Sequence, residues 1–150
     1  AKKAYRVPAL SARQAADLFF IRAVLEGAAA AIAALVIAPE EIAALRRQAA
    51  ATDAALRTRD ATGFLEGNFR FHAGVFRTAR NADLAQMIES LYARTGPWLA
   101  HGITALAAPE DWTSEHDAIV DALERRDGEA ARRLTERDAR WGMALYQRQR

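Results

Sequence analysis

The stretch that decides the fold runs from Phe64 to Arg80 and reads FLEGNFRFHAGVFRTAR. At the period of an α-helix, its aromatic and branched apolar residues fall on one stripe, which predicts a helix packed against a core. Asn68 and His72 fall on the same stripe, one turn apart. A buried amide or imidazole costs about 1–3 kcal/mol unless it is hydrogen-bonded. The stripe therefore predicts polar partners on the neighbouring helices.

The composition limits the classes of protein to which the chain can belong. It has 150 residues, enough for one domain, and 51% of them are hydrophobic. No apolar run approaches the ~18 residues of a membrane span and no signal peptide is evident, so we expect no membrane partner. The absence of cysteine excludes disulfides and thiolate chemistry and suits the cytoplasm. A net charge of +2, with acids and bases interleaved, does not indicate that this chain itself binds nucleic acid.

Six helix starts can be placed, and no period-2 strand pattern is present. Each start carries residues that favour the first turn of a helix: Ser11 with Gln14 in a capping box, Pro39, Asp60, Asn81, the segment Pro109 to Ser114, and Asp127. Residues 1–10 lack a helical period and are interpreted as a linker or arm from a segment upstream. The sequence therefore predicts an all-α antiparallel bundle of about six to seven helices over residues 11–150.

The first of these helices, expected from Ser11 to about Val36, carries a charge on its apolar side. Its expected inward stripe consists of Leu18, Ile21, Leu25, Ala28 and Ile32. Arg22 lies on that stripe, and an inward guanidinium needs an anion because it cannot lose its charge. Two interpretations stay open: an ion pair with Glu26 one turn on, or an anchor for an anionic ligand.

A second candidate binding region surrounds Gly96-Pro97. Proline removes one backbone hydrogen bond and kinks a helix, so we expect it to interrupt the helix that follows Asn81. Arg94 and His101 lie seven residues apart on one face of that helix. The kink either opens a cavity in which these two side chains contact a ligand, or leaves them on a solvated edge.

Polar residues from three expected helices interrupt apolar stripes: Asn68, His72, His116 and Asp138. Two neutral imidazoles, a carboxylate and an amide oxygen can ligate a divalent ion of the Zn, Ni, Mn or Fe class. Because an imidazole must be neutral to bind a metal, such a site should lose its ion as the pH falls through about 6.5. The alternative is a metal-free cluster held by hydrogen bonds. We expect no organic cofactor.

At these residues the sequence resembles the FCD domain, the effector-binding C-terminal domain of the FadR subfamily of GntR-type bacterial transcription regulators. The resemblance covers nearly the whole chain. Its motifs are individually weak but occur in the family's order and spacing: Asp17-Leu18 with Arg22 to Glu26, Asn68 to His72, Ala79 to Leu84, Glu115 to Leu123, and Arg126 to Ala131. The resemblance implies an all-helical, non-enzymatic domain that binds an effector and dimerises.

The family's metal site uses an aspartate and three histidines, and this chain departs from it twice. Asn68 occupies the aspartate position, and Asp138, twenty-two residues after His116, occupies the position of the last histidine. The formal ligand charge is therefore kept but moved to another helix. A carboxylate in place of an imidazole makes the ligand set harder, which shifts the expected preference from Zn towards Mn, Fe or Ni.

The resemblance implies a sensor of a small carboxylate effector, with Arg22, Arg94 and His101 as candidate contacts. It also implies a homodimer, which suits a regulator that reads a two-fold operator. DNA would be bound only through a further domain preceding Ala1. Two alternatives stay open: a helical dimerisation module with a metal-free pocket, and a metalloenzyme with the two-histidine, one-carboxylate ligand set of non-haem iron. The second alternative lacks an evident acid–base group or nucleophile.

Overall fold

The computed structural model describes residues 10–105 and 114–147, with side chains described for 10–100, 114–141 and 143. Within these ranges the chain forms six helices and no strand, so the predicted all-α bundle is confirmed. The helices are α1 (Ala12–Val36), α2 (Pro39–Arg57), α3 (Ala61–Thr78), α4 (Ala82–Ala105), α5 (His116–Glu124) and α6 (Gly128–Gln147). The predicted arm falls, except for Leu10, outside the described residues.

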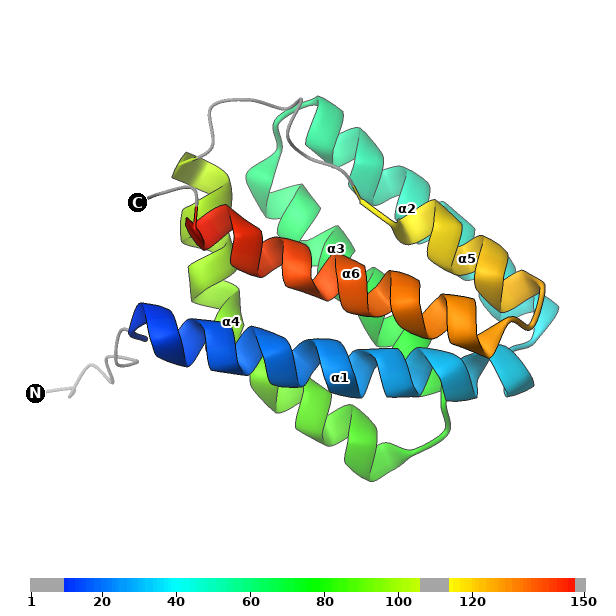
Figure 1. Cartoon of the computed structure of the whole chain (residues 1–150). Coiled ribbons are helices and arrows are strands. Elements are labelled where there is room, and N and C mark those ends of the chain that lie inside the picture. Colours follow the sequence, from blue (N-terminus) through cyan, green and yellow to red (C-terminus); the bar gives the residue numbers. More distant parts are fainter. Residues whose placement is uncertain (1–9, 106–113, 148–150) are drawn as a thin grey trace, which may run out of the picture.

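The long helices α1 and α6 lie side by side and antiparallel, with α3 behind them (Figure 1). Small residues bring α1 and α6 close together. A Cβ atom added at Gly128 would lie 3.0 Å from the carbonyl oxygen of Ala31, and one added at Gly27 would lie 2.6 Å from Cγ of Glu136. This close packing allows side chains from α1, α3 and α6 to meet in one place.

The helix starts agree with the capping residues in the sequence. The backbone N–H of Gln14 donates to the Ser11 hydroxyl at 3.2 Å, and the N–H of Ser11 donates to the Gln14 side chain at 2.9 Å. The Asp60 carboxylate accepts a hydrogen bond from the N–H of Gly63 at 2.9 Å, and Asp127 caps α6 in the same way. Such caps occupy N–H groups that the first turn of a helix leaves unpaired.

Two local expectations about α4 and α5 are wrong. The helix α4 continues through Gly96-Pro97 as one element, Ala82–Ala105, instead of being interrupted there, since proline removes only one backbone hydrogen bond. The helix α5 begins at His116 rather than within 109–114, most of which lies outside the described residues. On the same helix α4, the apolar side chain of Met87 is exposed.

The orientation of α1 also differs from the expected one. Ile21 and Ile32, expected to face inward, are exposed on its outer side. Its buried side is made of alanines (Ala15, Ala23, Ala29, Ala30, Ala33 and Ala34) together with Leu18, Phe19, Gly27, Arg22 and Glu26. The helix is turned this way because only small side chains fit where α1 packs against α6. Hydrophobicity alone does not report that constraint.

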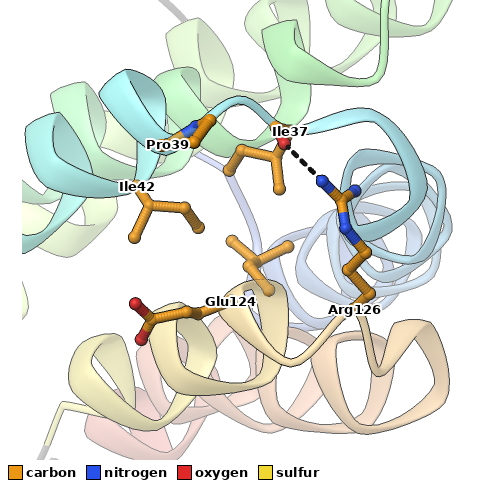
Figure 2. A pocket seen from close by; sticks show the side chains of 6 residues that line it. Ile37, Pro39, Ile42, Glu124 and Arg126 are labelled. Carbon is orange, nitrogen blue, oxygen red and sulfur yellow. Dashed lines mark hydrogen bonds between the residues drawn. The ribbon is translucent and has the colours of Figure 1, made fainter.

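By length and composition α1 is the one helix among the described residues that could cross a membrane. Half of its most apolar window is buried inside the bundle, and core helices of soluble proteins pass the same test. Its carboxyl end is fixed by Arg126, whose guanidinium donates to the carbonyl oxygens of Leu35 at 3.1 Å and Ile37 at 3.3 Å. Figure 2 shows the contact with Ile37 at the edge of a small pocket between α2 and α5. The pocket does not include the polar cluster described below.

Candidate functional site

His72 lies at the centre of the buried polar cluster, between two carboxylates. Its Nε2 is 2.9 Å from Oδ2 of Asp138 on α6. Its Nδ1 is 3.2 Å from Oε2 of Glu26 on α1, at ion-pair distance although not aligned for a hydrogen bond. The imidazole of His72, on α3, therefore lies between Glu26 of α1 and Asp138 of α6.

Asp138 connects three helices. Its Oδ1 accepts a hydrogen bond from the backbone N–H of Glu115, just before α5, at 2.9 Å. Its Oδ2, already paired with His72, lies 3.8 Å from Nε2 of His116, the first residue of α5. The carboxylate thus both holds the start of α5 and faces two imidazoles.

His116 is the least satisfied group of the cluster. Its ring packs against Phe71 with centroids 4.1 Å apart, and the residue is fully buried. Neither of its ring nitrogens has a hydrogen-bond partner within the described residues. Buried polar atoms are hydrogen-bonded in the great majority of cases, so an unpaired imidazole indicates a missing partner such as a metal ion or a ligand.

Arg22 and Glu26 extend the cluster along α1. The Arg22 Nε donates to Oε1 of Glu26 at 3.0 Å, and another guanidinium nitrogen donates to the Thr95 hydroxyl of α4 at 3.0 Å. The guanidinium also lies 3.8 Å from the centroid of the Tyr92 ring. The hydroxyl of Tyr92 donates to Oε2 of Glu26 at 2.9 Å. The expected ion pair is therefore present, inside the bundle.

The two carboxylates keep His72 protonated in the metal-free protein. Burial alone would lower the pKa of His72, but Glu26 and Asp138 outweigh that effect and raise it to about 9. Burial would likewise raise the pKa of Asp138, yet its hydrogen bond and charge attraction to His72 lower it to about 2. The pKa of Glu26 is also lowered, because Arg22 and His72 overcome its burial.

His116 is in the opposite state. Burial lowers its pKa to about 4, and the attraction of Asp138 does not compensate. At neutral pH the cluster therefore holds one cationic imidazole, one neutral imidazole with a free lone pair, and two carboxylates. A neutral imidazole next to a carboxylate is the arrangement that a divalent metal ion requires.

The donor atoms of His72, His116 and Asp138 fit a metal ion. They lie within 4.8 Å of one another. Donors bonded to one tetrahedral ion at 2.0–2.2 Å lie about 3.3–3.6 Å apart, so side-chain movements of about 1 Å would bring all three into range. The ion would give His116 the partner that it lacks. Asn68 is buried one turn before His72, on the same face of α3.

The structure does not bring all the predicted ligand contacts together. Arg94 is exposed on α4, one residue before the buried Thr95. The side chain of His101 lies outside the described residues. Three groups that sequence reasoning did not assign to the site take part in it: Glu26, Tyr92 and Thr95. The spacing of Glu26, four residues after Arg22, indicated only an ion pair within α1. No sequence pattern in α4 set Tyr92 and Thr95 apart from ordinary core residues.

Comparison with known proteins agrees with this architecture. The sequence profile of the FCD domain matches residues 17–140. The solved structure of E. coli McbR/YncC is similar, with a TM-score of 0.85 and 26% sequence identity over 96% of this chain and 69% of that chain. A search of the curated protein sequences found no match. Together the family and this neighbour indicate a domain of a transcription regulator and not an enzyme, so the metalloenzyme alternative is not supported. The helical bundle, the polar cluster and these matches agree, and the chain belongs to the FCD domain family.

Proposed function

We propose that this domain senses a small carboxylate by means of a divalent metal ion held in the cluster, and that it acts in the cytoplasm as part of a homodimeric regulator. DNA would be bound by a separate domain of the full-length protein. The observation that carries the proposal is His116, a buried neutral imidazole without a hydrogen-bond partner, beside the carboxylate of Asp138. His72, His116 and Asp138 would hold the ion, with Asn68 as a weak fourth contact.

The ion would supply a positive centre with open positions for the effector. Arg22 would contact the effector carboxylate through the part of its guanidinium not used by Glu26 and Thr95. Arg94 and His101 remain proposed contacts nearer the solvent. Tyr92 and Glu26 position Arg22 and His72 rather than the effector itself.

Because His72 is protonated in the metal-free protein, metal binding should depend on pH over a higher range than the sequence alone predicted. The unperturbed value of about 6.5 predicted that binding weakens only in mild acid. Because the pKa of His72 is about 9 in the metal-free protein, a proton competes with the metal throughout the neutral range. We therefore expect the metal affinity to rise with pH up to about 9.

Metal content after purification without a histidine tag, followed by titration with Zn, Ni and Mn, tests the metal site. The melting temperature should rise with metal, since a ligand at 100 times its Kd adds about 2.7 kcal/mol of stability. His116→Ala should remove the shift. Asp117→Asn, an exposed acid one residue later on α5, is the matched control and should keep it. A domain that stays metal-free and unshifted at millimolar metal would have only a structural cluster.

The ligand set itself offers a second test. Asn68→Asp combined with Asp138→His rebuilds the set of one aspartate and three histidines and should tighten Zn binding relative to Mn. The wild-type chain should show the weaker Zn preference. Equal Zn affinity of the two proteins would mean that the residues at 68 and 138 do not contact the ion.

A panel of small mono- and dicarboxylic acids, tested with and without metal, separates the sensor from a dimerisation module with an inactive pocket. A carboxylate effector should raise the melting temperature of the metal-loaded domain. Arg22→Lys keeps the charge beside Glu26 but loses the planar fork, so it should weaken effector binding while leaving metal binding in place. If no acid stabilises the wild-type domain, the dimerisation module is the better description.

A further inference from the structure

The outer side of α1 is apolar along most of its length. From Leu18 to Val36 the only charged residues are Arg22 and Glu26, and both are buried. The exposed large side chains on this helix are Phe20, Ile21, Val24, Ile32, Leu35 and Val36, with exposed fractions from 37% for Val24 to 69% for Leu35. We call these six residues the outer face of α1. Monomeric proteins rarely expose a contiguous apolar patch larger than a few hundred Å².

The outer face has a two-fold pattern in its sequence. Counted from Ala28, which is half-buried, Val24 and Ile32 lie four residues to either side. Ile21 and Leu35 lie seven residues to either side, and Phe20 and Val36 lie eight. If two copies of α1 packed antiparallel with Ala28 at the centre, each large apolar residue of one copy would lie beside a large apolar residue of the other. Val24 would meet Ile32, and Ile21 would meet Leu35. The small side chain at the centre allows two helix axes to approach to the 8 Å end of the usual range.

The surface next to the outer face enlarges it. Glu89 of α4 pairs with Arg77 of α3, so the flank of α4 that carries Glu89 faces α3. Met87 lies two residues earlier, about 200° around the helix and so on the flank of α4 that faces away from α3, and α4 packs against α1 as well as α3. Its side chain is 59% exposed.

The exposed area is of the size that a dimer needs. Given ~150–250 Å² for a fully exposed large side chain, the outer face and Met87 together expose roughly 600 Å² per copy. A standard interface buries about 800 Å² per partner. A surface without charges also brings no like charges together when it meets its own copy, as an isologous contact requires.

We propose that the outer face of α1 is the centre of the homodimer interface, with the two α1 helices antiparallel and the two-fold axis at Ala28. The inference rests on the homodimer proposed above, and it names the surface and the register. Phe20 of one copy then packs beside Val36 of the other, and the Met87 side chains close the interface at its edges. The metal and effector cluster lies on the opposite side of the same helix, through Arg22 and Glu26. Contacts at the cluster and between the copies thus share one rigid element.

The absence of cysteine from the chain makes a cross-linking test direct. Ala28→Cys should give a covalent dimer under mild oxidation, because the two Cα atoms near the axis fall within the ~7 Å that a disulfide allows. Val24→Cys with Ile32→Cys should cross-link as well, while either substitution alone should not. Ala43→Cys, at an exposed alanine on α2, is the control and should stay uncoupled.

Sedimentation equilibrium supplies the second test. The wild-type chain should be dimeric at tens of micromolar, and Leu35→Asp should be monomeric with unchanged helical circular dichroism, because Leu35 is already exposed. Ala43→Asp should remain dimeric. Metal binding by Leu35→Asp, measured in the same preparation, should persist, which keeps this test separate from that of the sensor.

Three results would overturn the assignment. A wild-type dimer that survives Leu35→Asp and does not cross-link through Ala28→Cys must use another face, and the sensor proposal would stand. A wild-type monomer at all concentrations would overturn both the interface and the homodimer. Flotation of the wild-type chain with lipid vesicles, lost in Leu35→Asp, would show that the outer face binds a membrane instead.

Discussion

The helices α1 and α3 both pack against the core, but they bury side chains of different size. In α3, large apolar residues such as Phe64, Phe71 and Phe76 face inward, and Asn68 and His72 among them belong to the site. In α1, alanines and a buried Arg22–Glu26 pair face inward, while Phe20 and Leu35 face outward. The difference shows that the side of a helix that is buried depends on the space its neighbours leave, as well as on hydrophobicity. Where α6 approaches closely, small residues are preferred over large ones.

The largest effect should come from breaking the charge pair on the inner side of α1. Arg22→Ala leaves two buried carboxylates, Glu26 and Asp138, with His72 as their one remaining cation, and breaking a buried pair in this way typically costs about 3–5 kcal/mol. The guanidinium is thus expected to matter for stability as well as for ligand binding, so the two interpretations of Arg22, an ion pair with Glu26 and a ligand anchor, are compatible. Urea denaturation of the metal-free domain measures the change.

The double variant Arg22→Met, Glu26→Gln serves as the control for that measurement. Because it removes both charges, it should recover most of the lost stability. If the single variant is as stable as wild type, the pair is solvated and the inner side of α1 is not a low-dielectric environment.

The second effect is the pH dependence of stability, which follows from His72. Its folded pKa of about 9 lies above the unfolded value, so its contribution is fully present below pH 6.5 and is lost as the pH rises through 9. At about 1.4 kcal/mol per pKa unit, the loss should be on the order of 3 kcal/mol. His116 acts in the other direction. Its pKa of about 4 means that stability is lost as the pH falls from 6.5 towards 4.

Denaturation of the metal-free domain at a series of pH values, with a chelator present, checks this prediction. Stability should be greatest near pH 6–7, between the two titrations. His72→Gln should remove the alkaline slope and leave the acidic one. A wild-type profile that is flat from pH 7 to 9 would contradict the assignment of a positive charge to His72.

A smaller effect should follow from adding bulk where α1 and α6 meet. In Gly128→Ala the new methyl group meets the backbone of Ala31 at 3.0 Å, and backbone cannot move aside as a side chain can. Overpacking of this kind costs about 1–3 kcal/mol. Gly96→Ala is the matched control, because a Cβ atom there meets nothing within 4 Å. Equal melting temperatures of the two variants would show that the contact between α1 and α6 is looser than described.

The smallest effect is expected on the outer side of α1. Ile21→Ser should change the free energy of unfolding of the monomer by no more than about 0.5 kcal/mol, as exposed substitutions generally do. It should weaken the dimer, which sedimentation measures separately. A large loss of monomer stability would mean that Ile21 is part of the core, as the sequence pattern alone suggested.

The parts of the fold that could be predicted are those governed by local chemistry. Ser11, Asp60 and Asp127 begin helices because a side-chain oxygen next to unpaired N–H groups has the same effect in any fold. The inward face of α3 was predictable because its apolar residues are large and periodic. The interruptions of the apolar stripes indicated His72, His116 and Asp138 as candidates, the resemblance to the FCD family supported them, and their donor atoms lie within 4.8 Å of one another.

The sequence by itself determined six helices, the capping residues Ser11, Asp60, Asn81 and Asp127, and which polar residues interrupt an apolar stripe. The tertiary structure decided the rotation of α1, because two stripes on that helix, one of alanine and one of large apolar residues, are both compatible with burial. It also decided that Glu26, Tyr92 and Thr95 join Arg22 and His72, since contacts between residues as far apart as 22 and 95 depend on how helices pack. The charge of each histidine follows from the same packing. Two carboxylates surround one ring and an apolar wall covers the other, and no local pattern in the chain encodes that difference.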